Sequence, residues 1–255
     1  MKVTGKLTRR QLAQTMPVHA DPLRFDNASF SGVNQVTFSY RTNTDAAAKL
    51  LPALLEIEQD PKVSVMFLDY GFSSVGPFRE YIQIVHASFR GDEVGFVPHI
   101  FITNERGMLA GREREGYPKL LGEVEFDMGG ANIYGLITAR LSRPAGVTLA
   151  QGIFRPSQRV GEITAANPRT VRAIALRVFG SAVPGGPLSV CELVPSGLAF
   201  VSGEIWSGDG ALMFTGASTF SAVHELPIIG DVEAVAFYNS AFNLQRPTET
   251  FPLEA

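Results

Sequence analysis

Residues 111–122, with the sequence Gly-Arg-Glu-Arg-Glu-Gly-Tyr-Pro-Lys-Leu-Leu-Gly, constrain the fold of this chain more than any other segment. Glycine permits backbone shapes and close approaches that other residues cannot take. Pro118 fixes its own φ and favours an extended conformation at Tyr117. Lys119 therefore follows a stiff turn and precedes two leucines. Held among apolar side chains, such a lysine can lose its proton and act as a nucleophile; the alternative is a polar surface loop in which it is solvated.

The composition describes a chain that can bury a substantial core. It has 255 residues, of which 45% are hydrophobic and 18% are charged, and a chain of this size can form one domain or two fused halves. The net charge is −3 without a basic block, so we predict no nucleic-acid partner. No run approaches the roughly 18 apolar residues of a membrane helix. We therefore predict no membrane partner.

Cysteine and histidine usage bears on location and metal binding. Cys191 is the single cysteine and has no partner for an internal disulfide, which indicates a reducing compartment. The basic residues near the N-terminus precede no apolar stretch, so no signal peptide is predicted and a cytoplasmic location is expected. Asn27 begins a glycosylation sequon that we interpret as chance. No histidine or cysteine pair has zinc spacing, and we predict no metal and no other cofactor.

The pattern of apolar residues predicts a β-rich α+β fold. Residues 1–21 are polar and non-periodic, so we interpret them as an N-terminal arm that is mobile or makes an oligomer contact. Residues 22–255 are interpreted as a single domain. Short helices are expected at 45–51, with Thr44 as the cap and Pro52 as the stop, and at 105–111. The strands are expected at 36–40, 63–70, 80–89, 94–103, 123–126, 131–141, 147–154, 171–179, 188–194, 199–206 and 211–214.

Two later segments leave alternatives open. The glycine- and proline-rich residues 181–187 are the best candidate for a seam between two halves of the chain. Residues 226–242 fit either one helix or two strands, because their periodicity does not distinguish the two.

The lysine segment resembles the Schiff-base signature of the acetoacetate decarboxylase superfamily. The matching pieces, in order along the chain, are Tyr40-Arg41-Thr42, Gly111-Arg112-Glu113, Tyr117-Pro118-Lys119, Leu121-Gly122, Glu204-Ile205-Trp206-Ser207-Gly208 and Leu212-Met213-Phe214. The resemblance covers roughly residues 22–240. It implies a strongly curved antiparallel sheet, or cone-like barrel, that holds the lysine inside, and a homo-oligomeric assembly. It also implies that Lys119 forms an imine with a small keto acid.

Two glutamates are the further catalytic candidates that the resemblance implies. Glu80 matches the position of a pocket glutamate; its alternative is a strand-edge carboxylate that pairs with Arg79 or with solvent. Glu115 matches a position that can carry an acid/base side chain in members with aldol or dehydration chemistry. Its alternative is a solvated carboxylate near Arg112 or Arg114.

Four residues are the candidates for substrate binding. Tyr117 is expected to form a wall of the pocket, and Arg112 is expected to reach it if it folds inward. His99 and Phe101 share one face of their strand by period two, so both are expected to line the pocket. For His99, a hydrogen-bonded core histidine is the alternative.

The chain departs from the decarboxylases of the superfamily at three positions. Leu120 stands where a second lysine usually follows the first. Counting along the strands places Val33 and Val65 where the decarboxylases carry an arginine and a glutamate that handle the substrate carboxylate. The missing charged pair and the presence of Glu115 favour aldol or dehydration chemistry over acetoacetate decarboxylation.

The sequence therefore predicts a Schiff-base lyase that acts on a small, pyruvate-like keto acid by aldol or dehydration chemistry. An acetoacetate-type β-keto acid decarboxylase is the alternative within the same class. A hypothesis of another class is a non-catalytic barrel that binds a small apolar ligand and in which Lys119 is inert.

Overall fold

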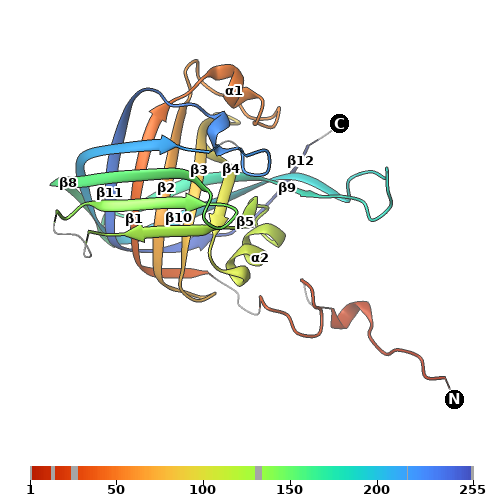
Figure 1. Ribbon diagram of the computed structural model, residues 1–255. Coiled ribbons are helices and arrows are strands. Elements are labelled where there is room, and N and C mark those ends of the chain that lie inside the picture. Colours follow the sequence, from red (N-terminus) through yellow and green to blue (C-terminus); the bar gives the residue numbers. More distant parts are fainter. Residues whose placement is uncertain (1, 13–14, 24–27, 130–133, 217, 254–255) are drawn as a thin grey trace.

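The computed structural model describes residues 2–12, 15–23, 28–129, 134–216 and 218–253. Its described strands belong to one large, strongly curved sheet that does not close into a regular barrel, and Figure 1 shows the short helices at its edges. This confirms the predicted β-rich fold class. No helix within the described ranges is long and apolar enough to cross a membrane.

The elements follow the chain in a simple order. The helices are α1 (Thr44–Ala48), α2 (Glu105–Glu113) and two 3-10 turns, η1 (Arg9–Gln11) and η2 (Val223–Glu225). The strands are β1 (Ser29–Arg41), β2 (Lys62–Ser73), β3 (Phe78–Phe89), β4 (Asp92–Ile102), β5 (Lys119–Leu121), β6 (Glu123–Asp127), β7 (Ile137–Ser142), β8 (Thr148–Ile163), β9 (Arg169–Phe179), β10 (Val190–Phe214), β11 (Ile229–Gln245) and β12 (Phe251–Pro252).

The sheet curls because its hydrogen-bonding path returns on itself. The strand order is β11-β1-β2-β3-β4-β9-β10-β8-β7-β6, and β10 also pairs with β11. β10 is 25 residues long; it pairs with β9 over its first part and with β8 over its second part. The pairings are antiparallel except those of β4 with β5 and with β9. This curvature gives the sheet an inner and an outer face.

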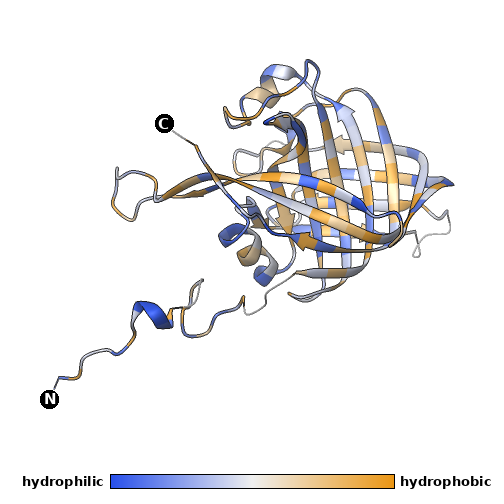
Figure 2. Cartoon of the chain, turned by 180° about the vertical axis from the view of Figure 1, so that it is seen from behind, coloured by the Kyte–Doolittle hydropathy of each residue, from blue (hydrophilic) through white to orange (hydrophobic). Residues whose placement is uncertain are grey.

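The two faces of β1, β2 and β3 have different roles because side chains alternate along a strand. Figure 2 shows this alternation as a change of hydropathy from one residue to the next along many strands. One face carries Phe38, Phe67 and Tyr81, which are fully buried in the main core together with side chains from β6, β7 and β8. The other face lines a cavity. We call these the core face and the cavity face.

The structure corrects the expected elements in several places. Asn43, and not Thr44, caps α1, which ends at Ala48. The predicted strand 131–141 begins at Ile137, and its residues 131–133, like the sequon residue Asn27, lie outside the described residues. Residues 181–187 form the loop of the β9–β10 hairpin and are no seam.

The second half of the chain contains longer strands than expected. The segments 188–194, 199–206 and 211–214 are parts of β10, and the residues from Ile229 to Gln245 form the single strand β11. The sequence Gly208-Asp209-Gly210 fits a turn. In the structure these residues instead lie within β10 and pair with β8, and the register of that pairing shifts between Ser207 and Gly208. Such bulges bend a strand without ending it.

A buried polar network on the core face ties β1, β3 and β4 to η2. The Gln83 amide donates to the Tyr40 hydroxyl and to the Val223 carbonyl, each at 3.1 Å. The Tyr40 hydroxyl donates to the Leu226 carbonyl at 2.9 Å. His99 Nδ1 lies 2.9 Å from the Gln83 amide oxygen. Because buried polar groups are costly when unpaired, this network favours one arrangement of these elements.

Replacement of His99 by Gln should make the fold less sensitive to acid. Burial, with a smaller effect of His224, lowers the pKa of His99 from 6.5 to about 4. As the pH falls, His99 is protonated in the unfolded chain before it is protonated in the folded protein. The wild-type free energy of unfolding should therefore drop between about pH 6.5 and pH 4, by at most about 3 kcal/mol for this group. Urea unfolding across this range should show a smaller drop for His99→Gln; equal drops would contradict the prediction.

Candidate active site

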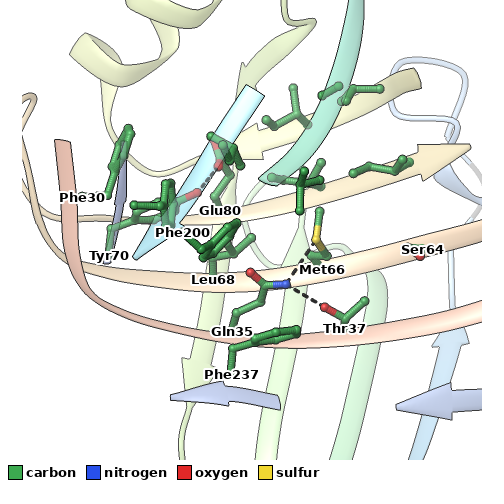
Figure 3. A pocket seen from close by; sticks show the side chains of 18 of the residues that line it. Phe30, Gln35, Thr37, Ser64, Met66, Leu68, Tyr70, Glu80, Phe200 and Phe237 are labelled. Carbon is green, nitrogen blue, oxygen red and sulfur yellow. Dashed lines mark hydrogen bonds between the residues drawn. The ribbon is translucent and has the colours of Figure 1, made fainter. Parts of the chain in front are cut away.

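A cavity of about 470 Å³ lies on the cavity face of the sheet. It is lined by side chains of β1–β4, β9–β11 and α2, and by the segment that carries the lysine. Figure 3 shows part of this lining, with Tyr70 and Glu80 on one side, Gln35 and Met66 in the middle and Ser64 beyond them. Four of the sequence candidates line it: Glu80, Glu115, Tyr117 and Lys119.

Lys119 and Glu80 form a buried ion pair in the lining of the cavity. Lys119 Nζ donates to Glu80 Oε1 at 2.6 Å, and the two side chains are 12% and 3% exposed. The Tyr70 hydroxyl donates to the other carboxylate oxygen of Glu80 at 2.9 Å. The Glu80 carboxylate therefore has one oxygen held by Tyr70 and one directed at the amine. The reading of Glu80 as an edge carboxylate paired with Arg79 is wrong, because Arg79 pairs with Asp69.

The backbone of the lysine segment is held tightly between α2 and β9. The Tyr117 N–H donates to the Gly111 carbonyl at 2.9 Å, and the Lys119 N–H donates to the Tyr117 carbonyl at 2.8 Å. Gly116 has φ +73°, and a Cβ there would lie 2.6 Å from the Cβ of Arg177. Only glycine meets both conditions without strain. The chain then enters β5, where Lys119 lies beside Ile100 in a parallel pairing.

Gly111 determines where the side chain of Lys119 can lie. A Cβ at this position would stand 2.6 Å from Cδ of Lys119, and it would also overlap Cε. The aliphatic part of the lysine thus passes directly over the helix at its glycine. Its ammonium group lies 5.9 Å from the ring centroid of Phe78 and 6.0 Å from that of Tyr117. These contacts place the amine between Glu80 and two aromatic rings.

Tyr117 forms a wall of the cavity, as expected. Its hydroxyl lies 2.5 Å from Ser196 Oγ. Burial raises the pKa of Tyr117 to about 12, so the phenol is neutral at physiological pH. A neutral phenol that bonds to Ser196 adds no charge beside Lys119.

Glu115 is buried on the same side of the cavity. It is 5% exposed, and Arg246 Nε lies 3.9 Å from its Oε1. Burial raises the pKa of Glu115, while the charges of Arg246, Lys119 and Arg114 oppose that rise. The reading of Glu115 as a solvated carboxylate is therefore wrong. A carboxyl group whose pKa is raised by burial can exchange protons nearer to neutral pH.

Three expected substrate-binding residues lie elsewhere. His99 and Phe101 do share a face of β4, but it is the core face: Phe101 belongs to the main core and His99 contacts Gln83. Arg112 is exposed, and its guanidinium donates to the backbone carbonyl of Lys119 at 3.1 Å. It therefore supports the lysine segment from outside the cavity.

The structure shows the surroundings of the two positions that were counted for the charged pair. Val65 belongs to the main core, and Val33 packs in a second core cluster. The side chains that meet across β1 and β2 on the cavity face are Gln35 and Met66, with Gln35 Nε2 3.3 Å from Met66 Sδ. Gln35 Nε2 also donates to Thr37 Oγ1 at 2.7 Å. The facing pair in this part of the cavity is therefore neutral.

Sequence reasoning missed Tyr70, Gln35 and Arg246. Tyr70 and Gln35 carry no motif, and strand register decides that they face the cavity. Arg246 follows β11, far from Glu115 in the chain. Among the residues that the structure describes, no group of three or more His, Cys, Asp or Glu side chains could hold a metal ion.

The chain belongs to the acetoacetate decarboxylase family: residues 15–251 match the family described as "Acetoacetate decarboxylase (ADC)". This confirms the resemblance inferred from the lysine segment. "Decarboxylase DEC1" of Cochliobolus heterostrophus is 32% identical over 249 residues, which cover 96% of this chain and 97% of that protein. "Acetoacetate decarboxylase" of Clostridium acetobutylicum is 23% identical over 81% of this chain and 80% of that protein.

Solved structures share the fold at low sequence identity. A structure from "Structural Studies of Acetoacetate Decarboxylase" has a TM-score of 0.82 at 19% identity, and covers 96% of this chain and 98% of that chain. The enduracididine biosynthesis enzyme MppR complexed with pyruvate has a TM-score of 0.74 at 19% identity, over 96% of this chain and 98% of that chain. These similarities establish the common fold.

Replacement of Gly111 by Ala should displace the side chain of Lys119 without unfolding the protein. Alanine favours a helix by about 1 kcal/mol over glycine, whereas its Cβ overlaps the lysine. Lys119 should then react several-fold faster with an amine-modifying reagent, as measured by peptide mass spectrometry. Gly180→Ala is the matched control, because a Cβ there meets no atom within 4 Å. Unchanged labelling of Lys119 in Gly111→Ala would contradict the assigned packing.

Proposed function

We propose that the protein is a β-keto acid decarboxylase that forms an imine through Lys119. The observation that carries this proposal is the amine of Lys119, 12% exposed and 2.6 Å from the carboxylate of Glu80, in a largely apolar cavity. The 32% identity to a decarboxylase over almost the whole chain supports the choice of reaction.

The reaction begins with a proton transfer within the ion pair. Lys119 gives a proton to Glu80, and the free amine attacks the ketone carbon of the substrate. Loss of water yields a protonated imine, which withdraws electrons from the neighbouring carbon. The bond to the carboxylate then breaks, its electron pair moves toward the imine nitrogen, and carbon dioxide leaves. Protonation of the resulting enamine at carbon and hydrolysis release a ketone and restore Lys119.

Glu80 is the residue that we propose moves these protons. Its Oε1 faces the amine and its Oε2 is held by Tyr70, so a proton accepted from Lys119 stays beside the reacting atoms. A positioned acid or base typically contributes about a hundred- to ten-thousand-fold to a rate. Tyr70 is the positioning residue that keeps the carboxylate in this orientation.

Aldol or dehydration chemistry on a pyruvate-like keto acid is the second candidate, and Glu115 is the observation that favours it. Its buried carboxyl group lies near Lys119, whose charge acts on it. The same imine can lose a methyl proton to give an enamine that adds to an aldehyde, and Glu115 would carry that proton.

A homo-oligomeric assembly and a cytoplasmic location remain part of our proposal.

Borohydride reduction in the presence of acetoacetate or pyruvate should add the mass of the reduced ligand to the wild-type protein. Lys119→Ala should gain no such mass. Lys62→Ala is the matched control, because Lys62 also lines the cavity but pairs with Glu233 at 3.8 Å; it should label like the wild type. Equal labelling of the wild type and Lys119→Ala would overturn the imine and favour an inert, ligand-binding barrel.

Side-by-side product assays should separate the two reactions. We expect release of carbon dioxide from acetoacetate, with kcat reduced at least a hundredfold in Glu80→Gln and less than tenfold in Glu115→Gln. The amide oxygen that Glu80→Gln introduces can still accept from Tyr70, so this loss reports proton transfer. The second candidate would be supported instead if pyruvate and an aldehyde gave a product, if Glu115→Gln abolished that product, and if acetoacetate released no carbon dioxide.

A further inference from the structure

We propose that the cavity binds a β-keto acid with a long apolar chain attached to its ketone carbon. The substrate class rests on the proposed function, whereas the chain-binding part of the cavity is carried by the structure alone. In this arrangement the ketone lies at Lys119, and the chain extends along β3 toward His86.

The length of the cavity exceeds the length of a four-carbon keto acid. Glu80, Ile82, Ile84 and His86 alternate along β3 and all line the cavity. At about 3.3 Å per residue, Glu80 and His86 lie about 20 Å apart along the strand. A four-carbon acid with bonds of about 1.5 Å spans at most about 5 Å. The volume of 470 Å³ lies within the roughly 300–1,000 Å³ of pockets for larger organic ligands.

The middle of the cavity is apolar across several strands. The strand register places Thr37, Met66 and Ile82 side by side in one layer. The next layer toward His86 consists of Ser39, Ser64 and Ile84. Ile84, Val97 and Ile100 form a cluster with Ile82, Met66 and Tyr117; all six line the cavity. The polar Gln35 and Thr37 bond to each other at 2.7 Å. A hydrocarbon chain that extends from the ketone at Lys119 therefore passes over apolar side chains and over Gln35 and Thr37, which hydrogen-bond to each other.

The lining becomes polar at the layer of Ile84 and beyond. Ser39 Oγ lies 2.9 Å from Ser64 Oγ, which lies 2.9 Å from His86 Nε2. Lys62 and Glu233 stand beside this cluster, with side chains 39% and 82% exposed. The apolar stretch from Glu80 to Ile84 is about 13 Å long. This corresponds to about ten carbon–carbon bonds, because each bond of about 1.5 Å advances an extended zigzag chain by about 1.25 Å. The best substrate should thus carry a chain of about ten or more carbons.

The first test is a series of straight-chain β-keto acids of increasing length. Burial of each added methylene should raise kcat/KM roughly fourfold until the apolar stretch is filled. Val235 faces Thr37 in the middle of the cavity, so Val235→Phe should lower the ratio of kcat/KM for the ten-carbon acid to that for acetoacetate at least tenfold. Val160→Phe is the matched control: Val160 is 53% exposed and lies outside the cavity lining, so this ratio should not change.

A binding measurement separates the chain site from the reaction. Lys119→Ala cannot form an imine, but long-chain methyl ketones should still bind it, with an affinity that increases with chain length and falls in the Lys119→Ala, Val235→Phe double variant. Calorimetry with the four-, seven- and ten-carbon ketones measures this. If no keto acid is decarboxylated but this length dependence holds, the chain site stands and the proposed reaction fails. Affinity and kcat/KM that do not increase with chain length would overturn the chain site.

Discussion

The buried ion pair between Lys119 and Glu80 is the interaction on which the site depends. Moving an ion out of water costs several kcal/mol, and a partner with good geometry is needed to offset that cost. The sheet supplies the partner from β3, the amine from β5 and the Tyr70 hydroxyl from β2. The 2.6 Å contact between Lys119 Nζ and Glu80 Oε1 is also short enough for the proton transfer with which the proposed reaction begins. The same contact therefore maintains the resting site and can start the proposed reaction.

The strong curvature of the sheet makes this arrangement possible. β1, β2 and β3 bury Phe38, Phe67 and Tyr81 on one face, and their other face lines the cavity. The core face fixes the strands through packing and through the Gln83 network, so the cavity face need not be filled with side chains. Space for a ligand is thus maintained by the packing on the opposite face.

The sequence predicted the lysine segment and the β-rich class well, because both depend on local chemistry. It failed where pairing register decides. A shift of one residue moves a side chain to the other face, and the pairing of β2 with β1 and β3 places Val65 in the core and Met66 in the cavity lining. His99 and Phe101 were correctly placed on one face, but their pairing opposite Gln83 and Tyr81 assigns that face to the core. Arg246 reaches Glu115 through a contact between distant segments that no local pattern encodes.

The neutral contact between Gln35 and Met66 fits the proposed hydrocarbon chain. A charged pair at this point would place charge beside the chain, and charge is costly to bury in apolar surroundings. An amide that is already bonded to Thr37 and an adaptable thioether avoid that cost. The proposed chain therefore has an apolar path toward His86. Affinity for the proposed substrate then comes largely from burial of the chain, which increases with each methylene.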